Sequence, residues 1–171
     1  YTISNTLSLH DALPICVAIR KVYSSTDGIT WTEAGTDALP VATYQHTSLV
    51  YNGKMWIIGG WAGGASSRKV YSSTDGITWT EAGTDALPAA TQQHSSVVFP
   101  ISGTDRMWII GGYAGGTGSR KVFSSTDGIT WTEAGTNALP VGTYAHTSLV
   151  FNGKMWIIGG YTTGVTRKVY S

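Results

Sequence analysis

The chain has 171 residues, the length of one ordinary domain, and only 12% of them are charged. Its formal net charge of +1 lacks the basic footprint of a protein that binds nucleic acid or an anionic membrane, and no apolar run is long enough to span a bilayer. Frequent glycine, threonine, serine and aromatic residues, without any helical pattern, predict an all-β fold of short strands and tight turns.

Residues 1–16 resemble translated adapter DNA from high-throughput sequencing. Read as codons, Thr6–Ile15 matches a common adapter in one frame, and Tyr1, Thr2 and Asn5 fit the adapter bases upstream. We therefore expect this segment to be an artefact at the start of a gene fragment, and we leave it out of the fold prediction. Cys16, the only cysteine, falls in this segment, so the sequence offers no disulfide and no cysteine nucleophile.

From Arg20 onward the chain repeats itself about every 50 residues. Each unit contains four apolar segments of strand length. In two copies Asn-Gly joins the first two segments, and Thr-Asp-Gly joins the last two, and both sequences favour tight hairpins. The connection between units contains a proline, which a central strand does not tolerate. In the first complete unit the predicted strands are His46–Tyr51, Lys54–Gly59, Arg68–Ser73 and Ile77–Ala82.

Four short antiparallel strands in a repeat of this length are typical of a propeller blade. The segment Lys54–Gly59 is apolar without alternation, so we expect both of its faces to be covered by neighbouring blades. The middle copy is four residues longer between its first two strands, where we expect a longer loop. The predicted units are a half blade at 17–36, blades at 37–84 and 85–136, and an incomplete blade at 137–171.

The repeats resemble those of the kelch family of β-propellers. The similarity lies in an apolar run that ends in two glycines, a following aromatic residue, a later tryptophan and a His-[Thr/Ser]-Ser start. In the first complete unit these are Trp56–Gly60, Tyr71, Trp79 and His46. The resemblance implies an open-arc, partial propeller of about three four-stranded blades, because closed rings need more. An arginine often found three residues before the histidine in that family is replaced by threonine at Thr43, Thr91 and Thr143.

The repeated polar residues are interpreted as parts of the scaffold. His46, His94 and His146 are weak candidates for metal ligands, but equivalent positions in successive blades spread around the axis, so each is expected to bond to a neighbouring blade. Asp27, Asp75 and Asp127 each precede a glycine and are expected to stabilise their own turns. The segment Ser24–Trp31 also resembles a shortened Asp-box of sialidases, a structural turn. We assign no catalytic residue, metal or cofactor.

The candidate ligand site is at the end of the blades where the copies differ. Glycine-rich loops after the second strand and the connections between blades share this end by strand order. The loops, which we expect to be flexible, carry one aromatic residue each, and aromatic rings with few charges nearby suit sugars or apolar peptide side chains. The alternative is that each ring packs onto the next blade. The candidate residues are Trp61, Tyr113, Tyr161, Tyr44, Gln93 and Tyr144.

Three functions stay open at this stage. The first is a non-catalytic module that binds a protein or a glycan, because near-identical copies suit repeated binding better than a single active site. The second is a piece of a galactose-oxidase-like or sialidase-like enzyme whose site lies in other blades. The third is a structural spacer. We also expect self-association through uncovered terminal blades, and no nucleic-acid partner. The compartment is left open.

Overall fold

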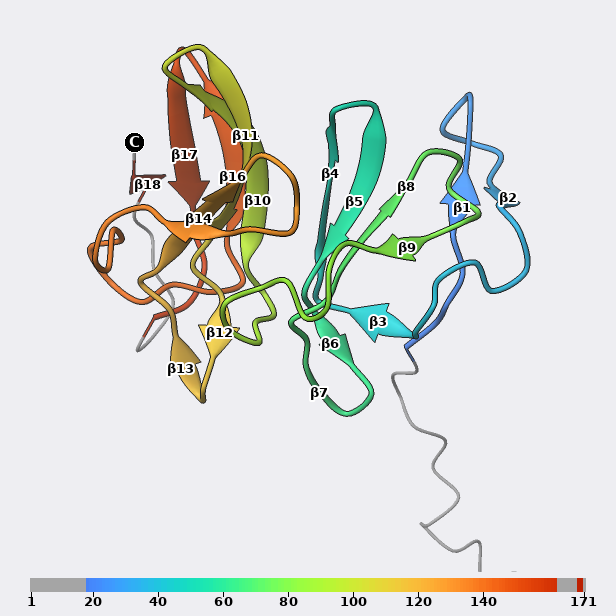
Figure 1. Cartoon of the computed structure of the whole chain (residues 1–171), viewed down its shortest axis with the longest axis horizontal. Coiled ribbons are helices and arrows are strands. Elements are labelled where there is room, and N and C mark those ends of the chain that lie inside the picture. Colours follow the sequence, from blue (N-terminus) through green and yellow to red (C-terminus); the bar gives the residue numbers. More distant parts are fainter. Residues whose placement is uncertain (1–17, 163–168, 171) are drawn as a thin grey trace, which may run out of the picture.

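The computed structural model describes residues 18–162 and 169–170, so the segment with the proposed adapter origin lies outside the described residues. The described chain is all-β, which confirms the predicted fold class, and none of it forms a helix that could cross a membrane. The main strands form antiparallel sheets arranged as an open arc (Figure 1). We call these sheets blades 1 to 4 in chain order.

Blade 1 has two strands, blades 2 and 3 have four each, and blade 4 has three. Within each blade the strands pair in chain order, and every pair is antiparallel. Blades 1 and 2 consist of β1 (Tyr23–Ser24), β2 (Thr32–Glu33), β4 (Thr47–Tyr51), β5 (Lys54–Ile58), β8 (Val70–Ser73) and β9 (Thr80–Glu81). Blades 3 and 4 consist of β10 (Ser95–Ile101), β11 (Thr104–Ile110), β14 (Val122–Ser125), β15 (Thr132–Glu133), β16 (Thr147–Phe151), β17 (Lys154–Ile158) and β18 (Val169–Tyr170).

The first hairpin of blades 2, 3 and 4 is closed by a two-residue turn. Asn52 and Gly53 have φ angles of 50° and 69°, the left-handed values that a type I′ turn requires. In blade 3 the four additional residues extend β10 and β11 instead of forming the longer loop that we expected. The last pair there is Ile101 with Thr104. Pro100 is tolerated because β10 is the edge strand of its sheet.

The last strand of blades 1, 2 and 3 is shorter than predicted. In blade 2 it comprises only Thr80–Glu81, because the preceding residues fold around Asp75. The Oδ1 atom of Asp75 accepts the backbone N–H groups of Ile77 and Thr78 at 2.8 and 2.7 Å, so these groups are not free to pair with β8. This arrangement recurs at Asp27 and Asp127.

The hydrophobic core lies between blades and not within one sheet. The second strand of blades 2 and 3 is buried on both faces, as its unbroken apolar sequence predicts. One cluster joins blades 2 and 3 and consists of Trp56, Ile58, Val70, Leu87, Met107, Ile109 and Trp131. The other joins blades 3 and 4 and consists of Val97, Trp108, Ile110, Val122, Leu139 and Ile157. Each blade therefore depends on its neighbours for burial of its apolar side chains.

Candidate functional site

Short secondary hairpins form one end of the molecule. It is the end at which the repeats differ in sequence and at which the candidate ligand site was predicted. These hairpins are the lowest elements in Figure 1, opposite the long hairpins of each blade. Two-residue strands replace the flexible loops that we expected, and glycine pairs with positive φ close them, as at Gly63 and Gly64. The hairpin strands are β6 (Trp61–Ala62), β7 (Ala65–Ser66), β12 (Tyr113–Ala114) and β13 (Thr117–Gly118), and β3 (Thr43–Tyr44) lies in the connection into blade 2.

Each secondary hairpin pairs with the connection that leads into its own blade. The pairing places one residue of the connection directly opposite the first aromatic residue after the double glycine. The opposed pairs are Tyr44 with Trp61, Gln92 with Tyr113, and Tyr144 with Tyr161. Five of the six residues are therefore aromatic, and they project from equivalent positions in three successive blades.

Three tyrosines form a continuous cluster across blades 3 and 4. The ring of Tyr144 stacks on Tyr161 with centroids 5.8 Å apart and an interplanar angle of 24°. The same ring meets Tyr113 edge to face, with centroids 5.2 Å apart. Tyr161 is 47% exposed, and the other two are partly exposed. The rings thus support one another and still present a surface to solvent. We call these three residues the tyrosine cluster.

A close approach of two glycines brings the tyrosine cluster together. The Cα of Gly118, in β13, lies beside the backbone of Gly142, and a Cβ on Gly118 would be 2.9 Å from the carbonyl oxygen of Gly142. A Cβ there would also be 3.2 Å from the Tyr144 ring. The equivalent residues between blades 2 and 3 are Ser66 and Ala90. The Gly118–Gly142 pair therefore favours contact between Tyr113 and Tyr144.

Gln93, the remaining candidate, contributes through its backbone. Its N–H donates to the carbonyl of Gln45 at 2.9 Å, and its own carbonyl accepts the N–H of Ala145 at 2.7 Å. These residues precede the first strand of successive blades, and all three have positive φ. The chain of bonds fixes one blade against the next. The residue that faces Tyr113 is Gln92, one position earlier, and its buried Oε1 has no hydrogen-bond partner among the described residues.

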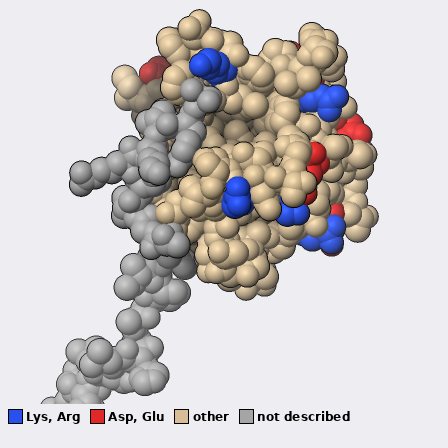
Figure 2. Space-filling model, turned by 90° about the vertical axis from the view of Figure 1, so that its left-hand side faces the viewer, with Lys and Arg blue, Asp and Glu red and all other residues tan. Residues whose placement is uncertain are grey.

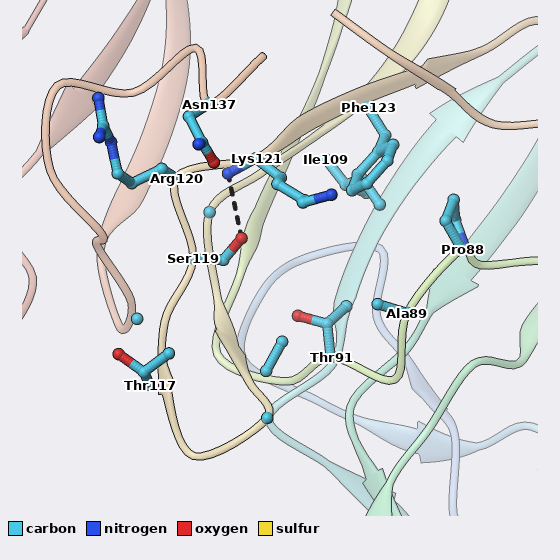
Figure 3. Close-up of a pocket in the computed structure, with 14 residues that line it drawn as sticks. Pro88, Ala89, Thr91, Ile109, Thr117, Ser119, Arg120, Lys121, Phe123 and Asn137 are labelled. Atoms are coloured by element: carbon cyan, nitrogen blue, oxygen red, sulfur yellow. Dashed lines mark hydrogen bonds between the residues drawn. The ribbon is translucent and has the colours of Figure 1, made fainter.

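A groove of about 440 Å³ lies beside the β12–β13 hairpin. Figure 3 shows Ile109, Phe123, Pro88 and Ala89 toward the right of the view and Ser119, Arg120 and Asn137 toward the left. In blade 2, Val41 replaces Ala89, and the equivalent residues line a groove of about 360 Å³ and a separate space of about 10 Å³. The groove therefore recurs in blade 2 in divided form. The prediction from sequence missed it in both blades.

The three histidines lie at the junctions between blades. The Thr47 hydroxyl of blade 2 is 3.0 Å from Nε2 of His94 in blade 3, so the predicted bond to a neighbouring blade is present at that position. Burial lowers the pKa of His94 to about 3 and that of His146 to about 4, and it also lowers the pKa of His46. The imidazoles are therefore neutral near pH 7. The described residues contain no group of three histidine, cysteine or acidic side chains that could hold a metal ion.

The repeated charged residues serve the scaffold. The pKa of Asp27 and Asp75 falls to about 2 because each carboxylate accepts two backbone N–H groups and a serine hydroxyl. Arg68 donates from Nε to the carbonyl of Leu87 at 2.7 Å, and Lys69 pairs with Glu81 at 2.8 Å. Equivalent bonds occur in the neighbouring copies. These groups are engaged in holding strands and turns together.

The fold is a β-propeller. Residues 36–120 match the family model of the DUF6242 beta propeller domain, which is a similarity over blade 2 and most of the way into blade 3. A search of curated proteins gave no match. The similarity supports the propeller arrangement of the sheets and says nothing about a ligand.

Proposed function

We propose that this propeller is a non-catalytic binding module that recognises a glycan through the tyrosine cluster. The observation that carries the proposal is the row of three touching tyrosine rings, which spans two blades and is open to solvent. Flat aromatic surfaces of this kind stack against the apolar faces of sugar rings, while the phenol hydroxyls can bond to sugar hydroxyls.

The surroundings of the tyrosine cluster favour a neutral ligand. The secondary hairpins at 61–66 and 113–118 and the connecting segments at 43–45, 91–93 and 143–145 contain no charged residue. Glutamine, threonine and serine supply the polar groups there. A charged ligand would find no counter-ion on these segments, whereas a neutral sugar would find donors and acceptors.

The proposal is tested by removing the central ring. Tyr144 touches both of the other tyrosines, so Tyr144→Ala breaks the cluster without altering a core position. On an array of neutral glycans we expect retention to weaken on the order of 10- to 30-fold, the usual effect of losing a central aromatic contact. Trp31→Ala is the control, because Trp31 is an aromatic residue that is 61% exposed but belongs to blade 1, on a turn at the opposite end of the blades.

Two outcomes of this experiment contradict the proposal. One is retention of a glycan that is unchanged in Tyr144→Ala. The other is the absence of any retained glycan together with retention of a protein from an extract, which would assign the same face to a protein partner.

We further propose that the repeats are of the kelch type and that residues 1–16 derive from adapter DNA. The kelch assignment is supported by the positions of its marker residues, since the double glycine ends the second strand and the histidine contacts the preceding blade. Sequencing the source gene across the codon for residue 16 tests the adapter origin. A natural coding sequence continuous through Tyr1–Cys16 would overturn it.

A further inference from the structure

The junctions between blades repeat the same contacts, and each contact joins a residue of one blade to a residue of the next. At each end of the arc, one of the two residues is present and its partner from a neighbouring blade is missing from the described chain. A first contact joins an isoleucine in the aspartate turn to a glycine of the preceding blade. A Cβ on Gly35 would lie 2.9 Å from Cγ2 of Ile77, and one on Gly83 would lie 2.9 Å from Cγ2 of Ile129. A Cβ on the equivalent Gly135 would have no atom of the described part of the chain within 4 Å, and the equivalent Ile29 is 86% exposed.

A second contact seats a histidine against the first glycine of the double glycine. A Cβ on Gly59 would lie 2.9 Å from Cε1 of His94, and one on Gly111 would lie 3.0 Å from Cε1 of His146. Among the residues that the structure describes, none lies within 4 Å of such a Cβ on Gly159 in blade 4. Its missing counterpart would be His46, which lines an unfilled space of about 620 Å³ beside blade 2.

Backbone hydrogen bonds and apolar side chains at the two ends of the arc also lack the partners that their equivalents have between blades. The bonds Gln93 to Gln45 and Ala145 to Gln93 leave the N–H of Gln45 and the carbonyl of Ala145 without an equivalent bond in the described part of the chain. Ile58 and Ile110 are 0% and 2% exposed where a blade follows, but Ile158 is 39% exposed. The blade 4 side of the molecule also presents a mostly uncharged surface (Figure 2).

We propose that two copies of this chain join head to tail, with β16–β17 of each copy filling the space beside blade 2 of the other. There they would pair with β1–β2 of that copy and complete a four-stranded blade. Residues 20–24 and 167–171 have the identical sequence RKVYS. Strand β1 can therefore replace β18 along β17 in the same register that pairs Ile157 with Tyr170.

The described repeats of two copies are sufficient for a closed ring. Each copy supplies two complete blades and half of each of two shared blades, so two copies make a ring of six. Closed propellers have about four to eight blades, and a ring of six lies within that range. Head-to-tail contacts form a ring when the rotation closes and a filament when it does not. The tyrosine clusters of both copies would then surround one axis on the same face.

The mass of the full chain in solution tests the proposal. By light scattering after size exclusion, under reducing conditions and at about 100 μM, we expect twice the 18.1 kDa of one chain. A single-copy mass at that concentration overturns the proposal, and so does an open series of larger assemblies, which would show that the contact does not close.

Two single variants and their mixture test the head-to-tail arrangement. Ile29→Glu and Ile158→Glu alter opposite ends of the arc, so each alone should show the single-copy mass, with association weakened at least about tenfold. Their equimolar mixture should regain the two-copy mass, because it retains one interface without either substitution. If two blade 4 surfaces paired face to face instead, mixing the two variants would not restore the two-copy mass. A mixture that stays at the single-copy mass therefore overturns the proposal. Ile101→Glu, on an exposed hairpin of blade 3, is the matched control and should leave the two-copy mass unchanged.

Discussion

Buried histidines make the stability of this propeller depend on pH. The folded-state pKa of His94 is about 3, well below the usual 6.5, because burial disfavours the charged ring. Between these two values the unfolded chain binds a proton that the folded chain does not, so stability falls as the pH is lowered through this window. Each such proton lowers the free energy of unfolding by about 1.4 kcal/mol per pH unit.

We therefore expect His94→Gln to flatten the fall in stability between pH 6.5 and pH 4, as measured by urea unfolding at a series of pH values. The aspartate turns lose their contribution only below about pH 4, toward their folded-state pKa of about 2, so the two windows are separable. His46→Gln is the comparison, because His46 is less buried and should change the slope less. Equal slopes in wild type and His94→Gln would contradict this account.

At the residue scale, sequence reasoning worked where a side chain serves its own turn. The carboxylate of Asp75 binds the two N–H groups that follow it, which the Asp-Gly sequence predicts. Sequence reasoning was less successful for contacts between residues of different blades or connections. The choice between Gln92 and Gln93 depends on strand register, and contact between Tyr113 and Tyr144 depends on the backbone approach at Gly118, neither of which a single sequence contains.

The aspartate turn is the element that ends the third strand, and a buried serine stabilises it. Ser73 Oγ accepts the N–H of Gly76 at 2.8 Å and donates to Asp75, and both Ser73 and Gly76 are buried. Ser73→Ala leaves that N–H unsatisfied, so we expect a loss of about 1–3 kcal/mol in the free energy of unfolding. Ser25→Ala removes the same bonds in blade 1, where the turn is exposed and water replaces them. An equal loss at both sites would show that burial is not the cause.

Strand order and pairing could be predicted because every hairpin has its own local signal. The turns at Asn52-Gly53 and Asp75-Gly76 lie where expected, and the apolar second strand is covered on both faces. Strand lengths were harder to predict. Strand β9 is short because Asp75 accepts N–H groups that could otherwise pair with β8, and β10 is long because its additional residues pair with β11. Both lengths therefore depend on which acceptor each backbone N–H group binds.

For the whole molecule, stacking of blades is the source of stability, and equivalent positions can measure it. Ile58 and Ile158 occupy the same position in near-identical strands, yet only Ile58 has a described blade packed against both of its faces. Ile58→Ala should therefore lower the free energy of unfolding by about 2–5 kcal/mol, the usual range for a buried isoleucine, while Ile158→Ala should lower it by about 1 kcal/mol or less in dilute solution.

Urea unfolding at protein concentrations below about 1 μM measures the stability of the single chain. Raising the concentration should bring the cost of Ile158→Ala toward that of Ile58→Ala, because the second copy would then bury this side chain. Equal costs at every concentration would mean that the strand itself, and not the neighbouring blade, sets the stability.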